Sequence, residues 1–108
     1  MLNALESEAL NTFKEQVYNQ FADEINKIIM YGSKARGDDN SESDIDILVV
    51  TKNDDWKTGD RIRDIGYSLD SEIGYSFSIQ VISQSHYDHL QQNGFHFIRN
   101  CEKEGILI

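Results

Sequence analysis

The sequence contains no proline and only one cysteine, Cys101. The absence of proline argues against an interdomain linker or a Pro-rich recognition tract. A single cysteine excludes an internal disulfide and is typical of a reducing cytoplasm. No apolar run approaches the ~20 residues of a membrane-spanning helix, and Met1 to Glu8 lacks the basic and apolar segments of a secretory signal. We therefore expect a cytoplasmic protein that does not enter a membrane.

Basic residues are also scarce. Ten Lys and Arg stand against nineteen Asp and Glu, which gives a net charge of −9. Such a chain repels polyphosphate backbones unless its few cations cluster, so we expect no non-specific nucleic-acid binding. The chain has 108 residues, of which 39% are apolar and 27% charged. These proportions are ordinary for a globular protein and predict a single domain over residues 1–108 with one modest core.

Apolar periodicity predicts alternating helices and strands. The first helix has an apolar stripe at Leu2, Leu5, Ala9, Phe13, Val17 and Phe21, with Glu6, Glu8, Lys14 and Glu15 on its other side. We then expect strands at 25–31, 45–50 and 75–82, a short helix at 35–36, and helices at 56–73, from Ser83 or Ser85 to 90, and around 97–101. This order predicts an α/β fold in which helices flank a small mixed β-sheet.

The most informative residues begin at Gly32-Ser33, where the first strand ends. A glycine lets a ligand approach the backbone closely. Ser33 supplies a hydroxyl at the start of a short helix, where free N–H groups attract an anion. Together the two residues predict a phosphate seat. The segment is not a P-loop, because Asp38 and Asp39 follow Gly37 where such a loop needs Lys and Ser or Thr.

Two aspartates, Asp44 and Asp46, follow after a ten-residue spacer. At positions i and i+2 of a strand their side chains leave the same face, with Cα atoms roughly 7 Å apart. Carboxylates so placed can converge on Mg²⁺, which commonly combines one or two carboxylates with substrate phosphates. The alternative is a Gly-Ser turn beside a solvated acidic loop. Because burying two carboxylates without a cation is costly, we favour a metal-bound nucleotide.

The segment resembles the signature of the DNA polymerase beta nucleotidyltransferase superfamily, which is Gly-Ser, about ten residues, then Asp-x-Asp. The chain looks most like the minimal nucleotidyltransferases, short proteins often encoded beside a HEPN-domain partner as a toxin–antitoxin pair. An N-terminal amphipathic helix, Lys34 to Gly37, Ser43 to Asp46 and the ending Lys103 to Ile106 also fit that layout. The resemblance implies a palm-like nucleotidyltransferase fold.

The resemblance further implies Mg²⁺-dependent transfer of a nucleotide, usually AMP from ATP, to a macromolecular acceptor. In minimal antitoxins the acceptor can be a tyrosine of the HEPN toxin. Gly32 and Ser33 would hold the triphosphate, while Asp44 and Asp46 would be the catalytic metal ligands. Lys34 and Arg36 would offset phosphate charge, although Arg36 could instead pair with the acidic loop.

One departure from the superfamily concerns its third carboxylate, which lies on a later strand. The strand at 75–82 has no acid, and Ser78 or Gln80 stands at the corresponding position. Neither is a strong metal ligand or a base near neutral pH, and Glu42 and Glu72 are weak candidates to replace the missing acid. The alternative function is therefore an inactive antitoxin or adaptor that keeps the fold and binds its partner directly. The oligomeric state is left open.

Overall fold

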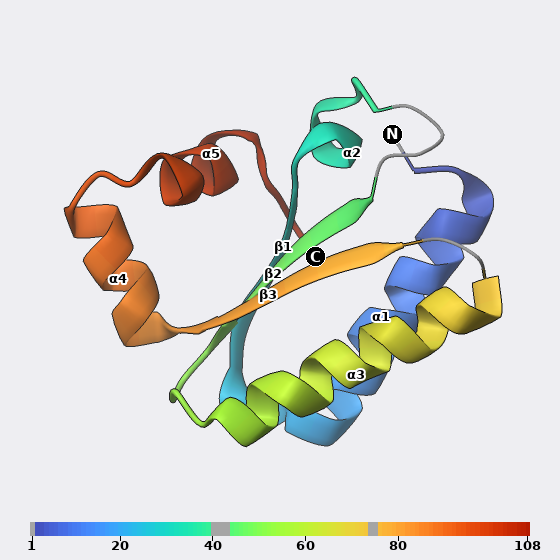
Figure 1. Cartoon of the computed structure of the whole chain (residues 1–108), viewed down its shortest axis with the longest axis horizontal. Helices are drawn as coiled ribbons and strands as arrows, with labels where there is room; N and C mark the ends of the chain where they lie inside the picture. Colours follow the sequence, from blue (N-terminus) through green and yellow to red (C-terminus); the bar gives the residue numbers. More distant parts are fainter. Residues whose placement is uncertain (1, 40–43, 74–75) are drawn as a thin grey trace.

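The computed structural model describes residues 2–39, 44–73 and 76–108, with the backbone alone at 71–73 (Figure 1). In chain order the elements are α1 (Ala4–Phe21), the 3-10 turn η1 (Ala22–Glu24), β1 (Ile25–Tyr31), α2 (Ser33–Arg36), β2 (Ile45–Thr51), α3 (Trp56–Ile73), β3 (Phe77–Ser83), α4 (Gln84–Gln92), α5 (His96–Glu104) and β4 (Ile106–Leu107). Within these ranges no helix is long and apolar enough to cross a bilayer.

The strands form one mixed sheet in the order β3-β2-β1-β4. β1 is antiparallel to both β2 and β4, and β2 is parallel to β3. The parallel pair requires a crossover connection, which α3 supplies. This arrangement confirms the prediction of a small mixed sheet flanked by helices.

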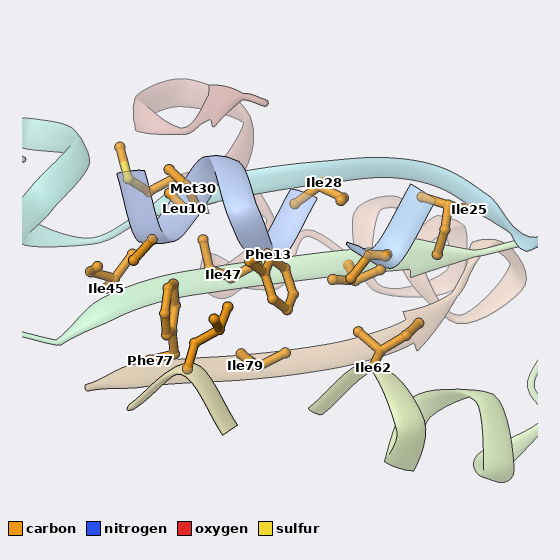
Figure 2. Packing of buried hydrophobic residues seen from close by; sticks show 14 of the residues in the cluster. Leu10, Phe13, Ile25, Ile28, Met30, Ile45, Ile47, Ile62, Phe77 and Ile79 are labelled. Carbon is orange, nitrogen blue, oxygen red and sulfur yellow. The ribbon is translucent and has the colours of Figure 1, made fainter. Parts of the chain in front are cut away.

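Helices cover both faces of the sheet (Figure 1). α1 and α3 lie on one face, where the larger apolar cluster includes Phe13, Ile47 and Ile79 (Figure 2). The rings of Phe13 and Phe77 stack there with centroids 5.7 Å apart. α4 and α5 cover the other face with a smaller cluster. Because successive side chains of a strand alternate between faces, Asp46 shares the face of α4 and α5.

The predicted stripe of the first helix is wrong at two neighbouring positions. Leu5 is 57% exposed, whereas Glu6, expected on the polar side, is only 3% exposed. The cause is a capping box, in which the Glu6 N–H donates to Asn3 Oδ1 at 2.8 Å and the Asn3 N–H donates to Glu6 Oε1 at 3.0 Å. The second Glu6 oxygen reaches Lys34, so the first turn presents a charge to the interior.

The chain after α3 largely follows the prediction. Of the two candidate caps for α4, Ser83 is the one used, since its hydroxyl accepts from the His86 N–H at 3.2 Å. The segment at 106–107, which the sequence indicates only as apolar, forms the edge strand β4 by pairing with Ile29 and Met30. Gly74 and Tyr75, expected at a helix end and a strand start, lie outside the described residues.

The contrast between two leucines of α1 tests this packing. Leu10 is 7% exposed and Leu5 is 57% exposed. Leu10→Ala should lower the free energy of unfolding by about 2–5 kcal/mol, because it leaves a cavity in the core. Leu5→Ala should change it by less than about 1 kcal/mol. Urea unfolding of both variants measures the difference, and equal losses would contradict the described orientation of α1.

Candidate functional site

Gly32 lies where β1 turns into α2, and two features require glycine there. Its φ is +77°, a backbone conformation that residues with a Cβ atom rarely adopt. A Cβ atom at Gly32 would also collide with Oδ2 of Asp46. The predicted close approach to this glycine is therefore made by a carboxylate of the protein itself.

Helix α2 is a single short turn. The N–H groups of Ala35 and Arg36 donate to the Gly32 carbonyl at 3.1 and 3.0 Å, and the Gly37 N–H donates to the Ser33 carbonyl at 2.8 Å. Gly37, with φ +87°, ends the helix in the left-handed conformation. Ser33 opens the helix directly after Gly32 and is half-buried. The predicted order of turn, serine and helix start is therefore present.

Asp46 lies in the middle of the sheet, opposite Tyr31 of β1 and Ser78 of β3. Its side chain is half-buried, whereas Asp44, which the sequence predicts on the same strand, lies just before the start of β2 and is exposed. Burial raises the pKa of Asp46, the charge of Asp44 raises it further, and Arg36 lowers it. The two carboxylates therefore repel each other, and a bound cation would relieve this repulsion.

The chemistry of this donor pair fits magnesium. Two hard oxygen donors stand beside the start of a helix, and Mg²⁺ is commonly bound by one or two carboxylates together with substrate phosphates. Asp44 and Asp46 would hold such an ion. Among the described residues no group of three or more His, Cys, Asp or Glu could hold a metal ion.

The predicted position of a third carboxylate is occupied by a serine. Ser78 lies directly opposite Asp46 on the parallel strand β3, whereas Gln80 lies opposite Leu48 and is exposed. Neither residue carries a negative charge. The two suggested substitutes are not placed, because residue 42 and the side chain of residue 72 lie outside the described part of the chain.

Asp70 is an acid near the site that the sequence analysis missed. Its Oδ1 accepts a hydrogen bond from the Phe77 N–H at 2.8 Å, which ties α3 to the start of β3. Burial raises the pKa of Asp70, the Phe77 hydrogen bond lowers it, and the charge of Asp44 raises it. Nothing in the helical periodicity of residues 56–73 marks Asp70, because its role depends on a contact with the next strand.

Lys34, a predicted phosphate ligand, is buried and ion-paired. It is 5% exposed, and its Nζ lies 2.8 Å from Glu6 Oε2 and 3.1 Å from Asp39 Oδ2. Burial alone would raise the pKa of Glu6, but the Asn3 hydrogen bond and Lys34 outweigh it and hold that pKa below its ordinary value. Lys34 thus joins α2 to α1 and to the loop after α2. Its direct contact with phosphate stays a prediction.

Arg36 lies at the surface between two acids. Its Nε is 3.2 Å from Asp38 Oδ2, and its Nη1 is 3.4 Å from Glu104 Oε2 at the end of α5. The contact with Asp38 is the expected alternative to phosphate binding, and the contact with Glu104 was not predicted. Because Arg36 also lowers the pKa of Asp46, its charge reaches the carboxylate pair.

Comparison with known proteins identifies the family of this chain. The sequence profile of the family described as "Polymerase beta, Nucleotidyltransferase" matches residues 11–108. The chain belongs to this family. The resemblance that rests on Gly32-Ser33 and Asp44-Ile45-Asp46 is thereby confirmed at the level of the nucleotidyltransferase family.

Two relatives come from Methanocaldococcus jannaschii. "Putative protein adenylyltransferase MJ0604" is 34% identical over 103 residues, which are 95% of this chain and 97% of that protein. "Putative protein adenylyltransferase MJ0141" is 38% identical over 45 residues, 42% of this chain. The chain spans 46% of the length of MJ0141 in that match.

Solved structures show the same fold. One, described as a putative minimal nucleotidyltransferase, has a TM-score of 0.55 at 22% identity and covers 92% of each chain. Another, described as a toxin–antitoxin with AMP-PNP, has a TM-score of 0.54 at 15% identity over 88% of this chain and 68% of that one. At these identities the likeness concerns the nucleotidyltransferase fold.

The raised pKa of Asp46 predicts how stability depends on pH. Because the folded state holds this proton more tightly than the unfolded state, deprotonation of Asp46 above its folded pKa destabilises the fold. Asp46→Asn keeps the shape and removes the charge, so without metal at pH 7 it should increase the free energy of unfolding. This gain should shrink as the pH falls and disappear below the ordinary value of 3.8.

Urea unfolding in the presence of a chelator at pH 7 and pH 3 measures this effect. The exposed Asp54→Asn serves as the control and should leave the free energy of unfolding nearly unchanged. A lower stability of Asp46→Asn at pH 7 would show that the Asp46 charge stabilises the metal-free fold, contrary to the pKa argument.

Proposed function

We propose that this nucleotidyltransferase binds the Mg²⁺ complex of a nucleoside triphosphate and transfers the nucleotide to a macromolecule. ATP is the first candidate for this substrate. The observation that carries the proposal is the contact between the Asp46 carboxylate and the α-carbon of Gly32. This contact brings the carboxylate of Asp46, which would hold the metal, to the start of α2. Free N–H groups at the start of a helix favour phosphate. Gly32 and Ser33 form the phosphate seat, and Asp44 and Asp46 hold the metal.

Arg36 is the cation of the site. Its guanidinium is exposed, lies beside Asp38 and Glu104, and offers a planar fork that suits phosphate oxygens. Exposed ion pairs of this kind contribute little to stability, so a triphosphate can replace both acids at Arg36. Lys34 is held by the buried carboxylate of Glu6 and the partly buried carboxylate of Asp39, and we therefore assign it to positioning α2.

The reaction is a displacement at the α-phosphate. A bond forms between an acceptor oxygen and the α-phosphorus, the bond to the bridging oxygen breaks, and pyrophosphate leaves. A bound Mg²⁺ ion supplies charge neutralisation along the triphosphate. The residues of this chain orient the triphosphate, and the acceptor gives up its hydroxyl proton to a base near the site or to water.

The acceptor is a protein in this proposal. A domain of 108 residues has little room for an acceptor pocket. The relatives MJ0604 and MJ0141 bear the name of protein adenylyltransferases, and toxin–antitoxin structures share the fold. We accordingly propose that the chain acts in the cytoplasm as an antitoxin and that a HEPN-type toxin is its partner and acceptor.

A second candidate function is an adaptor that neutralises its partner by binding alone. Ser78 opposite Asp46 favours it, because the described residues place no third carboxylate beside Asp46. Without that group, the metal geometry and the deprotonation of the acceptor lose support. Nucleotide binding would survive in this case, while transfer would be slow or absent.

Mass spectrometry of the partner separates the two functions. The chain is incubated with the product of the neighbouring gene and Mg-ATP, and the partner should gain one AMP with release of pyrophosphate. Asp46→Asn should reduce the transfer at least 100-fold, because half of the metal-binding pair is lost, whereas the exposed control Asp54→Asn should retain it. A partner that is neutralised without any gain in mass would contradict transfer and favour the adaptor.

A further inference from the structure

Two aromatic side chains near the phosphate seat, Tyr31 and Phe97, have no role in the function proposed above. We propose that Phe97 of α5, supported by Tyr31 of β1, stacks on the base of the nucleotide whose phosphates lie at Gly32-Ser33. The two rings would thus be the base subsite. This inference rests on the proposed function, because it requires a nucleotide at the carboxylate pair.

The position of Tyr31 links the rings to the seat. Tyr31 is the last residue of β1, directly precedes Gly32 and lies opposite Asp46 in the sheet. The Phe97 ring meets the Tyr31 ring edge to face, with centroids 5.3 Å apart and planes at 89°. Aromatic pairs favour this geometry. A nucleotide held at Gly32 and Asp46 would therefore lie next to the rings of Tyr31 and Phe97.

The rest of α5 holds the Phe97 ring in place. Ile98 and Cys101 are 0% and 2% exposed and pack with Ile29 and Leu48 against the sheet. At the other end of the helix, Glu104 contacts Arg36 of α2. The packing of Ile98 and Cys101 holds α5 against the sheet, and with it the ring of Phe97, whether or not Glu104 keeps its contact with Arg36.

Phe97 nevertheless remains 38% exposed. Apolar ring surface beside a polar site is a suitable platform for a base, because every base has a flat face that stacks on aromatic side chains.

Binding of Mg-ATP and of Mg-tripolyphosphate, measured by calorimetry, tests the inference. Tripolyphosphate has the phosphates without the base. Phe97→Leu keeps an apolar side chain on α5 but removes the ring, so it should weaken ATP binding about tenfold and change tripolyphosphate binding less than twofold. Phe97→Trp keeps an aromatic ring and should bind ATP as the unaltered chain does.

Phe95→Leu is the matched control, since Phe95 is 50% exposed and lies two positions before Phe97. It should leave the affinity for both probes unchanged. If Phe97→Leu weakens the binding of both probes equally, Phe97 has a purely structural role. If it weakens the binding of neither probe, the exposed rings of Phe95 and Phe97 belong to a protein-docking surface instead. Either result overturns the inference while the proposed function stands.

Asp46→Asn distinguishes loss of the metal site from loss of the base subsite, because it should weaken the binding of both probes. If the unaltered chain binds neither Mg-ATP nor Mg-tripolyphosphate, the proposed function fails and the base subsite fails with it. If the unaltered chain binds both probes with equal affinity, the base contributes nothing, and the inference about Phe97 alone is contradicted.

Discussion

The contact between the Asp46 carboxylate and the α-carbon of Gly32 is the constraint on which the rest of the site depends. It follows from the antiparallel register that sets Tyr31 opposite Asp46, and it tolerates no side chain at position 32. Through this contact the end of β1, the start of α2 and the carboxylate of Asp46 form one unit. The surrounding sheet and helices hold that register in place.

The distribution of charge around this unit explains why an acidic chain can still suit an anionic ligand. Of the two cations in the Gly-Ser segment, Lys34 is buried between Glu6 and Asp39, and Arg36 lies at the surface. The buried lysine stabilises the position of α2, and the exposed arginine can exchange partners. In the proposed function, further positive charge at Asp44 and Asp46 would come from a bound metal, which would relieve the repulsion between the two carboxylates.

The sequence predicted most of the fold and the meeting of Gly32 with Asp46 at the candidate site, because both depend on local patterns. Periodicity located the helices and strands, and the Gly-Ser and Asp-x-Asp spacing located Gly32 and Asp46. The burial of Glu6 could not be predicted in this way, since its partner Lys34 is 28 positions away. Strand β4 exists only because the edge of β1 accepts it. Asp70 and Phe97 likewise acquire their positions through Phe77 and Tyr31.

Two glycines provide the most direct test of the central claim, that Gly32 and Asp46 form one Mg-nucleotide site. Gly32 and Gly37 both have positive φ, but a Cβ atom meets Asp46 at Gly32 and nothing within 4 Å at Gly37. Replacing either by alanine introduces similar backbone strain. Calorimetry should show that Gly32→Ala weakens Mg-ATP binding at least tenfold more than Gly37→Ala does. Equal affinities of the two variants would contradict the account.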